Sequence, residues 1–396
     1  MRILLLTAGT GGGHDMRADA FSSWVGRLTD WDTKIHRPLE QSHSLYRFGV
    51  GTYNWIQRTA PRLHRSYFGF LELAALHRNP RRILGAQRYM STIEAFQPDI
   101  IISTHAHLNH GFFDLAREKL GRSNVRCITY CGELGDGYGF SRHWVNPEAD
   151  LFIGAVEETV DAAIALGMPA HKTWRGGFML FPEFYDDDNE QGWRRQFVRE
   201  QFGLDADEFI VLLAIGAVGA NNHLDILKCL ERRAKRVQVV ALCGNDEKTF
   251  AAVASWGRQA SAVRLKALRY RRDMSLVLRS VSAVVSRPGT GTTSEAIMSG
   301  CPLIMNGIGG IMPQESVTVR YGVRHGIART IRSAGEVPEI LDTWEQNPHE
   351  LGELKKNVRD RHPARHPRDI LERAADCRLG SFERSIFDTH TGQGIR

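Results

Sequence analysis

The chain has no long hydrophobic run, and this absence narrows the class of protein. Its 396 residues contain no stretch of 18 apolar residues, so no membrane-spanning helix is expected. The opening segment 1–6 is too short for the apolar core of a signal peptide and leads directly into glycines, which predicts a buried first strand. Solenoid repeats and low-complexity tracts are also missing. A folded, soluble protein is expected.

Cysteine is scarce and unpatterned. No two cysteines have the Cys-x-x-Cys spacing, and reduced, unpaired thiols in a cytoplasmic protein are the simplest explanation. The six are Cys127, Cys131, Cys229, Cys243, Cys301 and Cys377.

Acidic residues are almost absent between Gln57 and Arg88, where seven arginines accompany the single acid Glu72. This segment therefore carries the whole net charge of +6, and aromatic and leucine side chains are interleaved with its arginines. Such a mixture is typical of an element that lies on an anionic membrane surface. A solvated helix face is the simpler alternative. No familiar nucleic-acid-binding module is visible, so no nucleic-acid partner is expected. The arginines are Arg58, Arg62, Arg65, Arg78, Arg81, Arg82 and Arg88.

The length and the order of elements predict two domains. A chain of 396 residues exceeds the size at which single cores usually stop growing. Short apolar runs alternate with helical patterns in both halves, which favours an α/β fold with two doubly wound parallel sheets. The expected strands are 3–6, 100–103, 127–130, 151–154, 210–215, 237–242, 283–286 and 302–305. The expected helices are 18–24, 94–96, 112–120, 157–166 and 370–375.

A linker is predicted at 176–189, which contains a proline and three consecutive aspartates. Neighbouring aspartates in a linker do not converge, so a solvated charge run is favoured over a metal site. We expect an N-terminal domain over 1–180 that binds the acceptor and the membrane, and a C-terminal nucleotide-sugar domain over 181–375. The tail 376–396 either packs back or is frayed, and the chain from Arg361 onward is expected to cross back over the domains.

The most informative segment is 284–306, where an apolar strand meets the loop Arg287-Pro-Gly-Thr-Gly-Thr-Thr and then a helix and a second strand. Small residues at such a loop allow backbone N–H groups to contact a phosphate at the positive end of a helix. Glu295, one turn into the helix, can accept hydrogen bonds from a ribose. This pattern predicts a nucleotide site, although Gly289 and Gly291 could also simply shape a turn.

Three further glycine-bearing loops follow predicted strands, at 7–14, 216–222 and 243–245. Ligands of parallel α/β sheets bind at the carboxyl ends of the strands. The four loops are therefore expected to face one cleft.

Together these motifs resemble the monogalactosyldiacylglycerol synthase family and, more distantly, the N-acetylglucosaminyltransferase that completes lipid II. The Thr-Gly-Gly-Gly-His loop at 10–14, the block from Arg287 to Ala296 and the Gln314-Glu315 pair match the family pattern. The segment Trp144–Asp150 is similar to a further family motif, and the likeness spans about residues 1–326.

The chain departs from the family in three places. Asp15 stands where the family usually has a basic residue, the loop 131–139 is richer in glycine, and the loop 307–313 is about two residues longer. The resemblance therefore supports the donor-binding core better than it supports the acceptor or the hexose.

The resemblance implies a GT-B architecture, a UDP-sugar donor and inversion at the anomeric carbon. It assigns Gln314 and Glu315 to the hexose hydroxyls, because an amide beside a carboxylate offers both donors and acceptors. The full set expected to bind the donor is Gly12, Gly13, Gly216, Gly219, Asn221, Gly244, Arg287, Gly289, Thr290, Gly291, Thr292, Glu295, Gln314 and Glu315.

Transfer to a hydroxyl group needs a base for its proton. His14 is the leading candidate, because three glycines at a strand end leave the backbone free to bring its imidazole into the cleft. His14 could instead cap the following helix, and Glu133 and Asp136 are rival carboxylate bases. Helix N-termini and Arg287 could stabilise the leaving diphosphate, so neither a metal nor another cofactor is required.

The sequence thus predicts an inverting glycosyltransferase that moves a hexose from a UDP-sugar to diacylglycerol or a related lipid, as a peripheral protein on the inner face of the cell membrane. Another lipid or hydrophobic acceptor is the nearest alternative. A UDP-sugar 2-epimerase and a non-catalytic lipid-binding regulator are alternatives of other classes.

Overall fold

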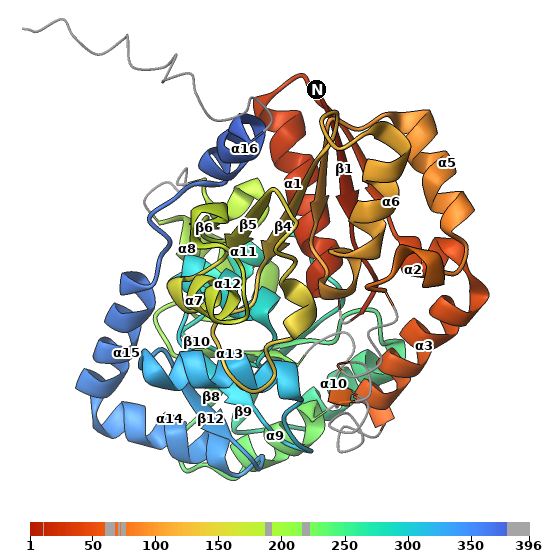
Figure 1. Ribbon diagram of the computed structural model, residues 1–396. Coiled ribbons are helices and arrows are strands. Elements are labelled where there is room, and N and C mark those ends of the chain that lie inside the picture. Colours follow the sequence, from red (N-terminus) through yellow and green to blue (C-terminus); the bar gives the residue numbers. More distant parts are fainter. Residues whose placement is uncertain are drawn as a thin grey trace, which may run out of the picture.

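The computed structural model describes residues 1–10, 12–59, 68–69, 72, 77–186, 192–215 and 222–377, with the backbone alone for 53–54 and 56–59. Two six-stranded sheets, in which the described strand pairs are all parallel, form the centres of two domains (Figure 1). The prediction of two doubly wound parallel sheets is confirmed.

The first sheet has the strand order β2-β1-β3-β4-β5-β6. Its strands are β1 (Arg2–Leu6), β2 (Asp32–His36), β3 (Ile100–Ser103), β4 (Arg126–Cys131), β5 (Leu151–Gly154) and β6 (Thr173–Arg175). The helices of this half are α1 (Gly13–Leu28), α2 (Pro38–Ser42), α3 (Ser44–Thr59), α5 (Ala86–Phe96), α6 (Gly111–Leu120) and α7 (Glu157–Ala165).

The second sheet has the order β12-β11-β10-β7-β8-β9. Its strands are β7 (Ile210–Ala214), β8 (Val237–Leu242), β9 (Val263–Leu268), β10 (Ala283–Ser286), β11 (Leu303–Asn306) and β12 (Ala328–Ile331). The helices are α8 (Trp193–Phe197), α9 (His223–Leu230), α10 (Glu247–Gly257), α11 (Met274–Ser280), α12 (Thr290–Met298), α13 (Pro313–Arg324), α14 (Glu336–Gln346), α15 (Pro348–Asp360) and α16 (Pro367–Asp376).

The apolar side chains of β1 are buried on both faces of its sheet, because successive strand residues point to opposite sides. Ile3 and Leu5 pack with Phe21 and Trp24 of α1, whereas Leu4 packs with residues of α5 and α6 on the other face. Each fully buried leucine or isoleucine contributes about 1.5 to 3 kcal/mol of transfer free energy. This two-sided burial fixes β1, and therefore fixes where the loop after Leu6 emerges.

The chain passes from the first sheet to the second between β6 and β7, and the predicted boundary at residue 180 falls in this segment. Trp24 of α1 donates its indole N–H to the carbonyl oxygen of Leu180 at 2.7 Å, which fastens the connection to the first domain. Asp186, the described member of the aspartate run, accepts two hydrogen bonds from Arg27 in a solvent-exposed ion pair.

Helix α16 crosses back to the first domain, as expected for the segment after Arg361. Its apolar residues Ile370, Leu371 and Ala374 join the core around Trp24. Figure 1 shows α16 alongside α1. The predicted C-terminal domain, with its limit at residue 375, includes this helix, whose apolar stripe is buried against the N-terminal domain.

All six cysteines are described, and all are free thiols, as expected. No helix in the described part of the chain is long and apolar enough to cross a membrane.

Candidate active site between the domains

The N-termini of α1 and α12 face each other where the two domains meet. A Cβ placed on Gly291, in the first turn of α12, would lie 3.4 Å from Cε of Met16 and 3.9 Å from Cα of Gly13. Gly12 precedes α1 with a φ of 83°, and Gly289 precedes α12. The glycine loops after β1 and β10, with Thr290 and Thr292 in the second, therefore meet across the domain boundary as predicted from their positions after strands.

Arg17 of α1 bridges the two domains at this point. Its Nη2 atom donates to the carbonyl oxygen of Gly132, after β4, at 2.8 Å and to Oγ1 of Thr290, the first residue of α12, at 2.7 Å. The guanidinium is buried, with 3% of Arg17 exposed. The sequence reasoning did not identify this residue.

Two carboxylic acids lie in the electrostatic field of Arg17. Burial raises the pKa of Glu133 to about 7, and the positive charge of Arg17 opposes this shift. Burial likewise raises the pKa of Glu295 to about 7, again against the effect of Arg17. Each group therefore titrates near neutral pH, which is a property of groups that exchange protons in active sites.

His14 is held by the end of strand β3. Its Nδ1 atom lies 2.7 Å from the carbonyl oxygen of Thr104, and its ring contacts the rings of His105 and Trp144. Burial, reinforced by the charge of Arg17, lowers the pKa of His14 to about 4, although the bond to Thr104 favours the protonated form. The imidazole is therefore neutral at physiological pH.

Asp136 does not join this group. Its carboxylate faces Arg324 of α13 at 3.5 Å, and its carbonyl oxygen accepts a hydrogen bond from Arg320. The glycines of this loop permit that contact, since a Cβ on Gly139 would lie 1.8 Å from the carbonyl oxygen of Pro313. The glycine-rich loop thus packs on the second domain, and Asp136 pairs with Arg324 and is not among the residues that line the cavity with His14.

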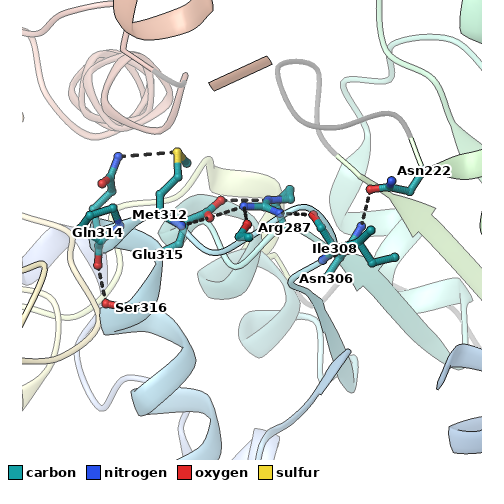
Figure 2. A network of polar contacts seen from close by, with 10 residues as sticks. Asn222, Arg287, Asn306, Ile308, Met312, Gln314, Glu315 and Ser316 are labelled. Atoms are coloured by element: carbon teal, nitrogen blue, oxygen red, sulfur yellow. Dashed lines mark hydrogen bonds and ion pairs between the residues drawn. The ribbon is translucent and has the colours of Figure 1, made fainter. Parts of the chain in front are cut away.

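Arg287 is engaged by its own domain (Figure 2). Its Nε atom donates to Oε1 of Glu315 at 3.1 Å, Nη2 pairs with the other carboxylate oxygen, and Glu315 also accepts from the backbone N–H of Met312. Arg287 further donates to the carbonyl oxygens of Ile308 and Gly310. These bonds fix the loop before α13, and they neutralise the charge that was expected to face a diphosphate.

Gln314 and Glu315 are adjacent in the sequence, but their side chains have different positions. Glu315 is 5% exposed and bonded to Arg287, so it positions the loop. Gln314 lines the cavity described below, together with Glu133 and His14. Of the two, only Gln314 is among the residues that line this cavity.

The remaining residues that were predicted to bind the sugar nucleotide follow β7 and β8 in the sequence. Gly244 has a φ of 58° and accepts a backbone hydrogen bond from Tyr270, so it shapes the turn between β8 and α10. Gly216, Gly219 and Asn221 lie outside the described residues. Their neighbour Asn222, at the start of α9, accepts a 3.4 Å hydrogen bond from Asn306 at the end of β11 (Figure 2).

A cavity of about 590 Å³ extends from the catalytic candidates into the first domain. His14, Glu133 and Gln314 line it together with apolar side chains from α2, α3 and neighbouring segments. The apolar residues of the lining include Leu39, Leu45, Phe48, Val50, Phe68, Leu84, Ala106 and Trp144. Leu45 and Phe48 are 58% and 71% exposed, so the apolar lining continues onto the surface of α3.

Thr10 and His105 add a polar pair to the cavity wall. Nδ1 of His105 accepts from the backbone N–H of His107 at 3.2 Å, which leaves the ring proton on Nε2. That nitrogen lies 3.0 Å from Oγ1 of Thr10 and donates to it. The tautomer fixed in this way turns the Thr10 hydroxyl into a donor. His105 was not singled out from the sequence, because nothing near it resembles a motif.

Comparison with known protein families supports this geometry. Residues 210–306 match the glycosyltransferase family 28 C-terminal domain, a range that runs from β7 to β11 and includes the loop at Gly289. The processive diacylglycerol beta-glucosyltransferase of Bacillus subtilis is 22% identical over 379 residues, which cover 94% of each chain. The chloroplastic monogalactosyldiacylglycerol synthase of Spinacia oleracea is 21% identical over 357 residues, which cover 87% of this chain and 66% of the spinach protein.

Solved structures are similar over nearly the whole chain. MurG of Acinetobacter baumannii has a TM-score of 0.61 at 14% identity and covers 95% of this chain and 99% of its own. Anabaena Alr3699/HepE in complex with UDP-glucose has a TM-score of 0.57 at 14% identity, with coverage of 95% and 98%. The resemblance noted in the sequence is confirmed: the protein is a glycosyltransferase with the GT-B fold, and residues 210–306 of its second half match the family 28 C-terminal domain.

Proposed function

We propose that the protein transfers a hexose from a UDP-sugar to diacylglycerol or a closely related lipid, with inversion at the anomeric carbon, at the inner face of the cell membrane. The observation that carries the proposal is the apolar cavity that connects His14 and Glu133 with the exposed apolar side chains of α3. An acceptor with hydrocarbon chains fits such an apolar cavity.

The donor would bind on the side of the second domain. The N-terminus of α12 provides backbone N–H groups and a partial positive charge for the diphosphate. Glu295 lies one turn further along the same helix and can accept hydrogen bonds from the ribose. Gln314 reaches the cavity and is available to the hexose. The UDP-glucose complex of HepE and the family match over 210–306 support a sugar nucleotide as the donor.

His14 would accept the proton of the acceptor hydroxyl through Nε2, because Nδ1 donates to Thr104. The acceptor oxygen then forms a bond to the anomeric carbon while the bond from that carbon to the diphosphate breaks. Glu133 lines the same cavity and remains the rival base, since its carboxyl titrates near neutral pH.

Helix α3 and the basic segment Arg58–Arg88 would hold the enzyme on the membrane. Leu45, Phe48 and Trp55 of α3 are exposed by 58%, 71% and 57%. Arg62 and Arg65 lie outside the described residues, whereas Arg81 and Arg82 are described and exposed. Exposed apolar side chains beside arginines favour binding to anionic lipid surfaces.

A transfer assay tests the proposal. The protein is incubated with labelled UDP-glucose, UDP-galactose or UDP-N-acetylglucosamine and diacylglycerol vesicles, and the lipid extract is examined. Label in a glycolipid is the expected result. Label that remains in the nucleotide fraction as an epimerised UDP-sugar would support an epimerase instead. Vesicle binding without consumption of any donor would support a non-catalytic regulator.

A further inference from the structure

Arg17 occupies an electrostatically unfavourable position in the protein alone. Cations are stabilised at helix C-termini, whereas helix N-termini carry partial positive charge. Arg17 nevertheless turns back toward the start of α1, where its Nη1 atom donates to the carbonyl oxygen of Gly13 at 3.3 Å. Its Nη2 atom contacts Thr290 at the start of α12. The guanidinium thus lies between two helix N-termini.

The charge of Arg17 has no counter-ion among the described residues. The guanidinium is buried, and buried charges in proteins are normally paired with an opposite charge. The carboxyls of Glu133 and Glu295 are close enough to respond to Arg17, but neither forms an ion pair with it. Two positive helix ends and an uncompensated cation together favour an anion at this point.

The guanidinium also retains hydrogen-bonding capacity. It carries five N–H donors, whereas the described residues give it three acceptors, on Gly13, Gly132 and Thr290. Its position depends on Gly132, since a Cβ on that residue would lie 1.9 Å from Nε of Arg17. A phosphate oxygen can use the remaining donors, and the planar guanidinium suits bidentate contacts with phosphate.

Arg287, the other arginine of the site, cannot take this role in the observed arrangement. Its charge is neutralised by the buried carboxylate of Glu315, and the carbonyl oxygens of Ile308 and Gly310 occupy further donors. Arg17 is therefore the cation without a partner charge next to the loop at Gly289.

We propose that Arg17 binds the diphosphate of the donor and stabilises the negative charge that develops on the leaving UDP. This inference rests on the proposed function. When the bond between the anomeric carbon and the phosphate oxygen breaks, its electron pair remains on that oxygen, and Arg17 together with the N-terminus of α12 stabilises it. Because Arg17 belongs to the first domain and α12 to the second, the diphosphate joins the two domains.

Calorimetry with UDP and with uridine tests the role of Arg17. The two ligands share the base and the ribose, so the difference between them isolates the diphosphate. Arg17→Gln removes the charge, and Arg17→Lys keeps the charge but loses the planar donor set. Arg27→Gln is the matched control, because Arg27 lies on the same helix and pairs with Asp186 away from the cleft. Thermal unfolding checks that each variant is folded.

Arg17→Gln should weaken UDP binding at least about tenfold, as expected for loss of a charge-assisted hydrogen bond. Uridine binding should be unchanged in every variant, and Arg17→Lys should fall between the parent and Arg17→Gln. Should Arg17→Gln fail to fold, Arg17→Lys decides, since full UDP affinity in that variant overturns the inference. Full affinity in folded Arg17→Gln also overturns it and leaves the proposed function intact. A parent protein that binds neither ligand overturns the proposed function itself.

Discussion

The Nδ1 atom of His14 lies 2.7 Å from the carbonyl oxygen of Thr104, so the first turn of α1 is tied to the residue after β3. A carbonyl oxygen only accepts hydrogen bonds, and therefore Nδ1 carries the ring proton. Nε2 of the neutral ring is then the basic atom. The contact gives His14 one tautomer and one orientation before any substrate binds.

The pH dependence of turnover distinguishes the two candidate bases. Burial lowers the pKa of His14 to about 4, so a His14 base stays unprotonated at and above pH 5, and kcat at saturating UDP-sugar should be flat from pH 8 to about 5. Burial raises the pKa of Glu133 to about 7, so a Glu133 base would give a rate that declines below neutral pH. The sequence alone would have placed the decline for His14 near 6.5, the value of an unperturbed imidazole.

Removal of the base should be visible in turnover alone. His14→Ala should lower kcat by about 10²- to 10⁴-fold, the usual contribution of a general base, while UDP binding changes by no more than a few fold. Glu133→Gln is the companion variant, and Asp136→Asn is the control, because Asp136 faces Arg324. High turnover in His14→Ala together with a large loss in Glu133→Gln would transfer the role of base to Glu133.

Glu133 should also influence stability in a pH-dependent manner. Its carboxyl binds a proton more tightly in the folded chain, with a pKa of about 7 against an ordinary value of 4.5. The stabilisation from this group is therefore complete below about pH 4.5 and is lost as the pH rises through about 7. Glu133→Gln should raise the thermal midpoint relative to the parent at pH 8 and less so at pH 5. Glu118→Gln, an exposed change on α6, should show no such difference.

The edge strands of the two sheets were not predicted from the sequence. The expected strands correspond to β1, β3, β4, β5, β7, β8, β10 and β11, most of which are buried along their whole length and appear as continuous apolar runs. Strands β2, β6, β9 and β12 were missed, and these four are the edge strands. Edge strands have exposed polar residues, as in Asp32–His36, so their apolar signal is short or broken.

Only those parts of the site that have a local sequence signature could be predicted from the sequence. Loops with a local signature, such as Gly289–Thr292, were found from their spacing after a strand. Arg287 was assigned to the diphosphate, but its pairing with Glu315 depends on a contact 28 positions away along the chain. Arg17 was missed because an arginine in the second turn of a helix usually faces solvent. The available signal was a cation near the helix start, where the helix dipole disfavours it.

Glu295 should contribute to nucleotide binding through the ribose. Glu295→Ala should weaken UDP binding by about 1.5 to 3 kcal/mol, the range for hydrogen bonds to a charged group, which is roughly 10- to 150-fold in Kd. Because burial raises the pKa of Glu295 to about 7, the loss should be larger at pH 8 than at pH 6. Calorimetry at the two pH values measures it. Equal affinity of parent and variant at both pH values would leave Glu295 as a structural residue of α12.

The exposed face of α3 should be required for vesicle binding. Changing Leu45 and Phe48 to Asn should release the protein from anionic vesicles, because both side chains are exposed at the mouth of the cavity. Tyr270→Asn is the matched control, since Tyr270 is 60% exposed on the second domain. Sedimentation with vesicles at low and high salt measures the difference.

The basic segment should add a salt-sensitive contribution to the same binding. Each arginine near an anionic surface contributes on the order of 1 kcal/mol. Changing Arg62, Arg65 and Arg81 to Glu should therefore greatly weaken sedimentation with anionic vesicles, while activity on a detergent-solubilised acceptor largely persists. Equal sedimentation of this variant and the parent at both salt concentrations would contradict a membrane role for the segment.

The dependence of UDP release on the acceptor shows whether the lipid cavity and His14 act together, because they do so only when an acceptor is bound. UDP release from the preferred UDP-sugar is measured without acceptor, with glycerol and with increasing diacylglycerol in vesicles. UDP release should be negligible without lipid or with glycerol, and with diacylglycerol it should be saturable and equal to the glycolipid formed. Release at the same rate without lipid, or with glycerol in its place, would contradict the proposed transfer to a lipid.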